Sequence, residues 1–144
     1  MARYVTTVRT EQTPAEVFAY MADLRNFAQW DPRVKKVVQV KGAAGGVDAQ
    51  FDVAVSGTTL RYITTEYEPD TNLLVVAKSR ALKSTDRITV VADGATTLVT
   101  YDALLELNGL LGLADPLLRL AFGRIGDRAA AGLRRVLSGE DVPA

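Results

Sequence analysis

The sequence predicts an α+β fold in which an antiparallel sheet bends around one long helix near the C-terminus. Between Arg33 and Leu107, apolar and polar residues mostly alternate, and turn-like stretches of hairpin length separate the runs, which is typical of consecutive antiparallel strands. Between Asp115 and Leu137, the apolar residues instead recur at helical spacing over about six turns. One or two short helices cannot cover a helix of this length, so we expect the sheet to wrap it.

One strand and two short helices precede this run of strands. Arg3–Thr10 is rich in Tyr, Val and Thr, which favour strands. Thr13 and Pro14 then indicate a helix start, with a threonine N-cap followed by proline at the first helical position. A second short helix is expected over Leu24–Trp30. Pro32 ends it, because the residue before a proline is pushed out of the helical region.

Six further strands are expected from the period-two pattern. The alternation breaks at Lys36-Val37, which predicts a bulge, and Asp93-Gly94 is a strong hairpin signal. Gly42–Gly46 predicts a flexible loop, and residues 80–85 predict a looser connection. The expected strands cover residues 33–41, 50–55, 59–68, 73–79, 86–92 and 96–107.

The long helix is expected to have Asp115 as its N-cap and Pro116 at its first position. At about 100° per residue, its apolar residues share one narrow arc that should face the sheet. Its charged residues lie towards the other side and are interpreted as a solvated face, because the neutral overall charge disfavours a membrane-surface role. The apolar arc consists of Leu118, Phe122, Ile125, Ala129, Leu133 and Val136, and the other side includes Arg124, Asp127, Arg134 and Arg135.

Small residues on this helix and one tryptophan allow alternative interpretations. Gly126 and Gly132 flank the apolar arc, although a glycine costs roughly 1 kcal/mol relative to alanine inside a helix. Either they permit close packing, or they keep side chains short and leave a void beside the helix. Trp30 is either a structural plug where the short helices meet the sheet or a residue at the mouth of a cavity.

The composition disfavours several classes of function. With 17 basic and 17 acidic residues, the formal net charge is zero, which disfavours a general nucleic-acid binder. The chain has no cysteine and no histidine, so disulfides, thiol nucleophiles and Ser-His-Asp or Cys-His arrangements are excluded. The carboxylates show no metal-ligand spacing and the glycines form no phosphate loop, so neither a metal nor another cofactor is expected.

The length and the absence of an apolar segment bear on organisation and location. At 144 residues, the chain is expected to form a single domain over residues 1–144. No signal segment and no apolar run near the ~20 residues that span a bilayer is present. A soluble, cytoplasmic protein without an integral membrane segment is therefore expected, and the sequence assigns no oligomeric state.

Short motifs along the chain carry a family resemblance: Pro14-Ala15-Glu16-Val17-Phe18, Asp23, Asn26, Trp30-Asp31-Pro32, Val34, Tyr67-Glu68-Pro69, Asp93-Gly94-Ala95-Thr96-Thr97 and Asp115-Pro116-Leu117-Leu118. Their order resembles the START/Bet v 1-like superfamily (SRPBCC), in particular its polyketide cyclase/dehydrase-like bacterial branch. The resemblance implies a helix-grip fold, in which a curved seven-stranded antiparallel sheet holds the C-terminal helix and a cavity lies between them. Members of this superfamily bind lipids, sterols, polyketides, quinones or plant hormones, and a minority catalyse cyclisation or dehydration.

The expected function is therefore binding or transport of a hydrophobic small molecule, such as a lipid, polyketide or quinone, in that cavity. Tyr101 is the expected polar anchor, because a buried tyrosine hydroxyl needs a partner, either a backbone carbonyl or the ligand. The pattern leaves the inward register of residues 59–68 open, so Glu66 is either a general acid or base in the cavity or a solvated charge. Arg61 and Arg87 are either anchors for an anionic group of a ligand or ordinary surface charges. The expected ligand-binding residues are Phe51, Val53, Tyr62, Val99, Tyr101, Ala103, Phe122, Ile125 and Ala129.

Two other functions remain open. A cofactor-free cyclase or dehydratase would steer an aldol-like step with its shape and a few tyrosine, arginine or carboxylate side chains, although no catalytic residue is assigned. A partner-binding protein with a filled core is the third alternative. Two or more ionisable side chains converging in the cavity would favour the enzyme, whereas an apolar cavity would favour the carrier.

Overall fold

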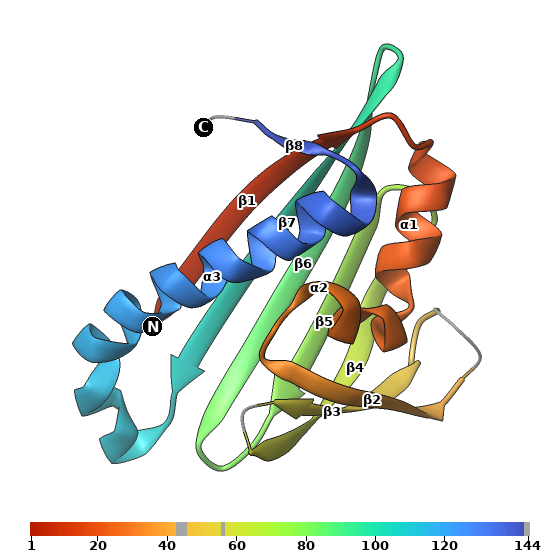
Figure 1. Cartoon of the computed structure of the whole chain (residues 1–144). Coiled ribbons are helices and arrows are strands. Elements are labelled where there is room, and N and C mark those ends of the chain that lie inside the picture. The colour runs from red at the N-terminus through yellow and green to blue at the C-terminus, as the bar shows by residue number, and fades with distance from the viewer. Residues whose placement is uncertain (43–45, 56, 143–144) are drawn as a thin grey trace.

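The computed structural model describes residues 1–42, 46–55 and 57–142. They form one curved antiparallel sheet, with short helices after the first strand and a long helix near the C-terminus (Figure 1). The helix-grip prediction of a seven-stranded antiparallel sheet is confirmed, and a two-residue strand adds to one edge. The strands are β1 (Ala2–Thr10), β2 (Val34–Lys41), β3 (Gln50–Val55), β4 (Thr58–Glu68), β5 (Asn72–Lys78), β6 (Leu82–Asp93), β7 (Thr96–Leu107) and β8 (Glu140–Asp141).

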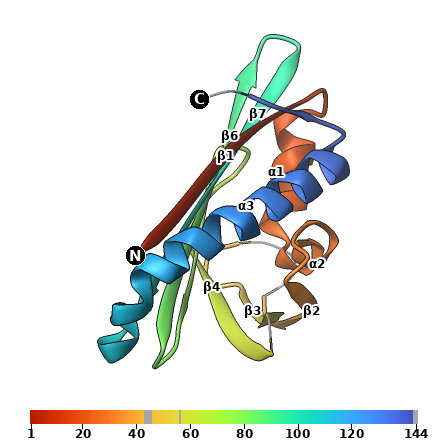
Figure 2. The same cartoon turned by 60° about the vertical axis from the view of Figure 1, so that its left-hand side comes forward.

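The sheet has the order β2-β3-β4-β5-β6-β7-β1-β8, so β1 pairs with β7 rather than with β2. The helices are α1 (Pro14–Ala22), α2 (Phe27–Trp30) and α3 (Asp115–Leu137), with 3-10 turns η1 (Leu24–Asn26) and η2 (Gly109–Ala114). All three α-helices lie on the same face of the sheet (Figure 2). Helix α3 runs beside β1 and reaches α2, while α1 lies against β6.

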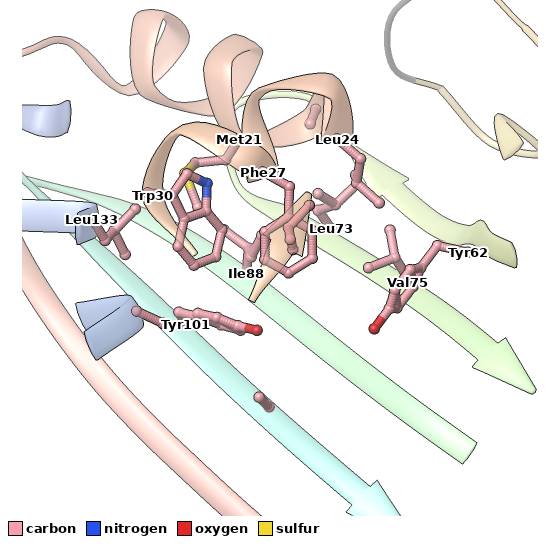
Figure 3. Close-up of a cluster of buried hydrophobic side chains, with 14 of the residues drawn as sticks. Met21, Leu24, Phe27, Trp30, Tyr62, Leu73, Val75, Ile88, Tyr101 and Leu133 are labelled. Carbon is pink, nitrogen blue, oxygen red and sulfur yellow. The ribbon is translucent and has the colours of Figure 1, made fainter. Parts of the chain in front are cut away.

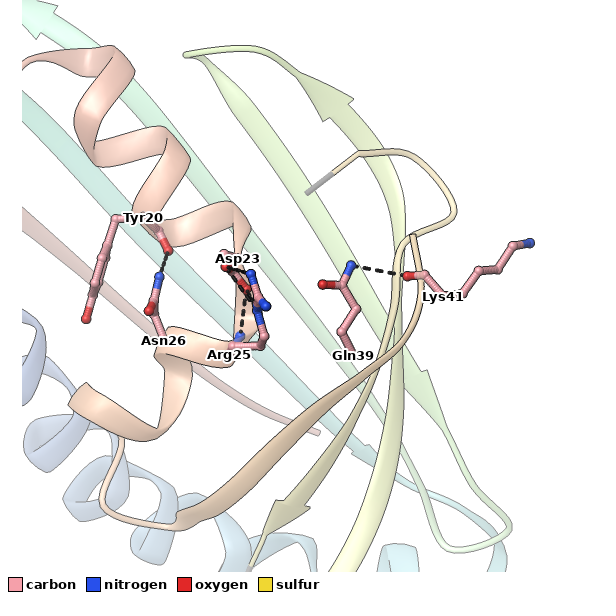
Figure 4. A network of polar contacts seen from close by, with 6 residues as sticks. All are labelled: Tyr20, Asp23, Arg25, Asn26, Gln39 and Lys41. Carbon is pink, nitrogen blue, oxygen red and sulfur yellow. Dashed lines mark hydrogen bonds and ion pairs between the residues drawn. The ribbon is translucent and has the colours of Figure 1, made fainter. Parts of the chain in front are cut away.

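Side-chain caps fix helix α1 and the turn η1 that follows it. The hydroxyl of Thr13 accepts a hydrogen bond from the backbone N–H of Glu16 at 3.2 Å, which confirms the predicted N-cap of α1. After α1, Asp23 accepts from the backbone N–H of Arg25 at 3.1 Å and from its guanidinium at 2.6 Å (Figure 4). The side-chain amide of Asn26 donates to a backbone carbonyl of α1, so η1 turns the chain directly into α2.

The short helices bury aromatic side chains against the sheet. Trp30 stacks on Phe27 with ring centroids 4.7 Å apart, and its edge meets Tyr101 of β7 at 5.1 Å. Figure 3 shows these rings with Met21 and Leu24 above the side chains of the central strands. Trp30 is buried in this cluster, so the structural-plug interpretation is the one that its packing supports.

A bulge in β4 settles the register that the sequence left open. Leu60, Tyr62 and Thr64 are buried on the inner face. The register then shifts between Thr64 and Glu66, so Glu66 lies exposed on the outside. The shift returns the next residue, Tyr67, to the helix side of the sheet, where its ring meets the α1 phenylalanine at 5.2 Å. Bulky residues on both faces of this strand therefore reflect a bulge rather than a two-sided core.

Strand β6 starts earlier than predicted. It begins at Leu82, so the expected loose connection over residues 80–85 is wrong from Leu82 onward. Ser84 and Asp86 occupy inward positions of the strand and are buried. Polar residues at inward positions conceal the apolar alternation on which the prediction depended. Strand β2 has an irregularity near the predicted bulge, but its register shifts between Val34 and Lys36, just before the predicted position at Lys36-Val37. Of the expected loop over 42–46, residues 43–45 lie outside the described residues.

Helix α3 covers the predicted residues, but its cap differs. The N-cap position belongs to Ala114, which makes no side-chain capping bond, so the prediction of Asp115 as N-cap is wrong. The reason is that η2 runs directly into α3 and its last residue takes the cap position. The predicted inward arc is confirmed, since Phe122, Ala129 and Leu133 are buried while Leu118, Ile125 and Val136 are partly buried.

The helix glycines serve close packing. A Cβ at Gly126 would overlap the ring of Tyr4 on β1, and a Cβ at Gly132 would overlap the backbone of Trp30. The alternative in which these glycines leave a void is therefore wrong. The cavity beside the sheet is lined by neither glycine, and a small residue that does line it is Ala103 on β7.

Candidate functional site

A cavity of about 200 Å³ lies between α3, the segment that joins α2 to β2, and strands β3, β4, β6 and β7. Its inner end is formed by buried side chains, and residues of its other end, such as Thr58, Leu82 and Ile125, are partly or fully exposed. Most of its wall is apolar. The lining residues are Phe27, Arg33, Val34, Val55, Thr58, Leu60, Tyr62, Leu82, Ser84, Asp86, Tyr101, Ala103, Leu105, Phe122 and Ile125.

The inner end of the cavity carries a chain of hydrogen bonds centred on Asp86. The hydroxyl of Tyr101 donates to Oδ2 of Asp86 at 3.1 Å, and the Ser84 hydroxyl lies 3.5 Å from Oδ1. The hydroxyl of Tyr62 donates to Oγ of Ser84 at 3.0 Å. Figure 3 shows the hydroxyl groups of Tyr62 and Tyr101 directed into the space between their strands. Four polar side chains from three strands are thus joined in one cluster.

Strand register explains why these groups meet. Ala77 on β5 pairs with Tyr62 on one side and with Ser84 on the other, so its small side chain leaves room for the tyrosine hydroxyl to reach the serine. Ala103 on β7 pairs with Asp86 in the same way. Because alanine occupies so little space, the carboxyl group borders the cavity instead of being packed over.

A buried ion pair forms another part of the wall. The Asp31 carboxylate is fully buried and accepts from Nη2 of Arg33 at 2.8 Å and from its backbone N–H at 3.0 Å. The guanidinium of Arg33 lines the cavity, so a positive charge and the carboxyl group of Asp86 share the same space. Pro32 stands between the two paired residues and ends α2, which places the pair at the point where the chain leaves the helix layer for the sheet.

Burial sets the protonation states in this cluster. It raises the pKa of Asp86 from 3.8 to about 7, and the negative charge of Asp31 adds to that effect. The hydrogen bond from Tyr101, the charge of Arg33 and the hydrogen bond from Ser84 oppose it. Burial likewise raises the pKa values of Tyr62 and Tyr101, which the charge of Asp86 raises further, so both phenols remain protonated donors.

This arrangement can bind and exchange protons with a small molecule. Near neutral pH, Asp86 is present both as a carboxylic acid that donates a hydrogen bond and as a carboxylate that accepts one. A group with a pKa close to the working pH is suited to general acid or base catalysis. Arg33 can balance a negative charge that forms or binds in the same cavity.

The structure brings together five of the nine residues predicted to bind ligand. Tyr62, Tyr101, Ala103, Phe122 and Ile125 line the cavity. The others do not line it: Ala129 borders a separate hollow of about 10 Å³, and Phe51, Val53 and Val99 are fully buried in the core.

The polar alternatives raised by the sequence are also resolved. The hydroxyl of Tyr101 donates to the carboxyl group of Asp86 and not to a backbone carbonyl. Glu66 forms an exposed ion pair with Arg87 at 3.1 Å, so it is a solvated charge. Arg61 pairs with Asp52 outside the cavity at 2.8 Å.

Sequence reasoning did not identify Arg33, Ser84 or Asp86 as site residues. The available signal was the spacing of Ser84 and Asp86 before Ile88 and Val90, which puts all four on one face of a strand. Polar residues in register with a buried apolar face are candidates for a site, because an unsatisfied buried carboxyl is costly.

Family comparison agrees with this geometry. The family model described as "Polyketide cyclase / dehydrase and lipid transport" matches residues 1–138. The chain belongs to this family. It is a START-like family, and its members' fold fits either hydrophobic ligand binding or cyclase activity. No curated protein matches the chain.

Solved structures share the fold at low sequence identity. A START superfamily protein from Mycobacterium smegmatis is 18% identical, with a TM-score of 0.72 over 96% of this chain and 98% of its own. The protein TTHA0849 from Thermus thermophilus is 15% identical, with a TM-score of 0.70 over 92% of each chain. The di-domain ARO/CYC StfQ from the steffimycin biosynthetic pathway is 9% identical, with a TM-score of 0.69 over 95% of this chain and 51% of its own. No helix in residues 1–42, 46–55 and 57–142 is long and apolar enough to cross a membrane.

Proposed function

We propose that this protein binds a small, largely apolar molecule in the cavity, with one polar group of that molecule against Asp86. The observation that carries the proposal is the asymmetry of the cavity wall. Apolar side chains form most of it, while Tyr62, Ser84, Asp86 and Tyr101 gather at its inner end. An apolar pocket with a few convergent polar groups is the usual form of a small-molecule site.

The volume restricts the ligand. An engineered apolar cavity of about 150 Å³ holds one benzene molecule. A cavity of about 200 Å³ therefore has room for a single ring with a short substituent. A four-ring sterol or a full-length aromatic polyketide exceeds this volume, so we expect single-ring compounds to be preferred among the ligand classes that the family fold accommodates.

The test is a probe series with one carbon skeleton. Ethylbenzene, 1-phenylethanol and acetophenone differ only in having no polar group, a hydroxyl or a carbonyl. We expect all three to bind, and the two polar probes to bind about tenfold more tightly, because one hydrogen bond contributes about 1–1.5 kcal/mol. Binding is measured by isothermal titration and by thermal stability, where a ligand at 100 times its dissociation constant stabilises the fold by about 2.7 kcal/mol.

Two matched variants locate the binding. Ala103→Leu fills the cavity next to Asp86, whereas Ala54→Leu makes the same change on β3, away from the cavity lining. We expect the first variant to lose probe binding and the second to keep it. Equal affinities of both variants and the unchanged protein would rule out the cavity as the site.

A second candidate function is proton-transfer catalysis on such a ligand. The observation that favours it is the convergence of Asp86 and Arg33, two ionisable side chains that border the same cavity. In this reaction the Asp86 carboxylate removes a proton from the carbon next to a ligand carbonyl, and the resulting enolate oxygen is balanced by Arg33 or accepts a hydrogen bond from a tyrosine. The Asp86 carboxylic acid then returns the proton to carbon or to oxygen.

Deuterium exchange separates the two functions. In heavy water, an enzyme exchanges the methyl hydrogens of acetophenone faster than buffer does, and Asp86→Asn abolishes the excess rate. If acetophenone binds but its methyl hydrogens exchange only at the rate seen in buffer, the protein is a binding protein without this activity.

A further inference from the structure

The outer side of α3 exposes leucines that the core does not use. Leu117 and Leu120 are 72% and 75% exposed, and Leu113 in the adjoining turn η2 is 83% exposed. The next most exposed large apolar side chains among the described residues are at 58%. These three leucines form a cluster of exposed apolar side chains. At helical spacing, Leu117 and Leu120 lie on the side of α3 that faces away from the buried Phe122, and Leu113 lies just before the helix.

Arginines continue the same side of the helix. Leu117, Ala121, Arg124 and Arg128 follow at intervals of three and four residues, so they form one stripe along α3. A shallow surface groove is lined by these four residues together with Leu120 and the partly buried Ile125. We call Leu117, Leu120, Ala121, Arg124 and Arg128 the leucine–arginine face.

The face is positively charged. None of the described residues that line its groove is acidic. Asp127, the acidic residue of the helix between the two arginines of the face, does not line the groove, and its exposed carboxylate accepts a hydrogen bond from the hydroxyl of Tyr4 on β1 at 2.8 Å. The zero net charge of the whole chain thus conceals a local basic surface beside exposed leucines.

We propose that the leucine–arginine face binds the surface of a bilayer that contains anionic phospholipid. Leucines at the start of α3 insert between the acyl chains, while Arg124 and Arg128 contact the phosphate groups. Figure 1 shows that η2 and the first turns of α3 lie at one end of the molecule, next to the start of β1, where a flat surface can reach them.

Charge distinguishes this partner from a second copy of the chain. A two-fold interface places the same surface on both subunits. Pairing the leucine–arginine face with itself would bring Arg124 and Arg128 of both copies together without an acidic group of the face between them. Anionic lipid supplies the opposite charge that the face lacks.

The face also adjoins the cavity. Ile125 lines both the cavity and the groove of the leucine–arginine face, so a bilayer bound there would lie beside one wall of the ligand site. Transfer of a ligand from the bilayer to the cavity rests on the proposed function. Binding to the bilayer does not depend on that function, and it is tested on ligand-free protein. A failure of bilayer binding is therefore distinguishable from a failure of ligand binding.

The test is co-sedimentation of the full chain with phosphatidylcholine vesicles that contain or lack phosphatidylglycerol. We expect binding only with phosphatidylglycerol and a loss of binding at high salt. Arg124→Gln/Arg128→Gln should weaken binding about 30-fold, since each basic residue near an anionic surface contributes about fivefold. Leu117→Ser/Leu120→Ser should weaken it at least about tenfold.

Matched variants control for charge and for exposed apolar area. Lys35→Gln/Lys36→Gln on β2 lowers the net charge by the same amount at exposed positions, and Val5→Ser/Val91→Ser removes exposed apolar side chains from β1 and β6. Both controls should bind as the unchanged protein does. Controls that weaken binding as much as the face variants would show non-specific adsorption and overturn the proposal.

A fluorescent label reports insertion directly. Because the chain has no cysteine, Leu120→Cys and Val91→Cys each accept an environment-sensitive dye at one position. Vesicles with phosphatidylglycerol should shift the emission to shorter wavelength at position 120 and not at position 91. The proposal is overturned if the unchanged protein does not bind the vesicles. It is also overturned if analytical ultracentrifugation shows a self-association that Leu117→Ser/Leu120→Ser removes, because that result would assign the face to a dimer.

Discussion

Replacing Asp86 by asparagine should make the protein more stable at alkaline pH. The substitution keeps the size of the side chain and an oxygen that accepts the hydrogen bond from Tyr101, but it removes the charge. In the folded protein, burial raises the pKa of Asp86 from 3.8 to about 7. A carboxyl group with a raised pKa is favoured in its protonated form, so the folded state loses stability as the pH rises from about 4 to about 7.

The magnitude follows from the two pKa values. Their difference corresponds to about 4 kcal/mol, at about 1.36 kcal/mol for each pH unit. Above about pH 7 the unchanged protein carries this whole penalty, whereas the Asp86→Asn variant carries none. We therefore expect the variant to be up to about 4 kcal/mol more stable at about pH 8, and nearly equal in stability at about pH 4, where both side chains are neutral.

The assay is urea unfolding of the unchanged protein and the variant over this pH range. Other carboxylates contribute equally to both proteins, so the difference between the two stability curves isolates Asp86. Asp52→Asn is the control, because Arg61 lowers the pKa of this carboxyl group on the outer side of β3, and removing it cannot raise stability at high pH. Parallel curves for the unchanged protein and Asp86→Asn would refute the assignment of a raised pKa to Asp86.

Three further predictions concern the cavity, the helix glycines and the ligand. Phe122→Ala should cost about 1–3 kcal/mol of stability in urea unfolding, less than the about 3–5 kcal/mol for Phe18→Ala, because Phe122 borders the cavity; equal losses would argue against that cavity. Gly123→Ala should stabilise α3 by up to about 1 kcal/mol, because no atom lies within 4 Å of the added Cβ. Gly132→Ala should instead destabilise by about 1–3 kcal/mol against the Trp30 backbone, and a gain there would contradict the close packing. Acetophenone affinity, measured by titration calorimetry, should fall as the pH rises through about 7 and be constant in Asp86→Asn, because only the protonated acid donates to the carbonyl; an identical pH dependence in both would exclude Asp86 as the donor.

Local patterns predicted the fold well because each element satisfies its own period. The helix over 115–137 and the strand over 96–107 were located to the residue, since apolar side chains mark most of their inner faces. Errors arose where a polar residue occupies an inward position, as Ser84 does in the missed first part of β6, or where a 3-10 turn runs directly into a helix, as η2 does into α3.

The candidate site was less predictable because it depends on contacts between strands. Tyr101 was identified as a polar anchor from its own position, but its partner lies fifteen residues away on a neighbouring strand. Asp86 meets Ala103 only through the register of β6 and β7, which the hydrophobic pattern does not specify. The helix glycines allowed either close packing or a void, and the choice depends on a tyrosine ring and a tryptophan backbone that no local pattern encodes.

The most direct measurement for the proposed function is a set of nuclear Overhauser effects between bound acetophenone and the protein. Ala103, Tyr101 and Phe122 line the cavity, and the proposed function directs the carbonyl of the probe toward Asp86. We predict contacts from the probe to the Ala103 methyl group and to the rings of Tyr101 and Phe122. Contacts confined to the exposed Leu117 and Leu120 would place the ligand on the outer side of α3 and contradict a binding site between helix and sheet.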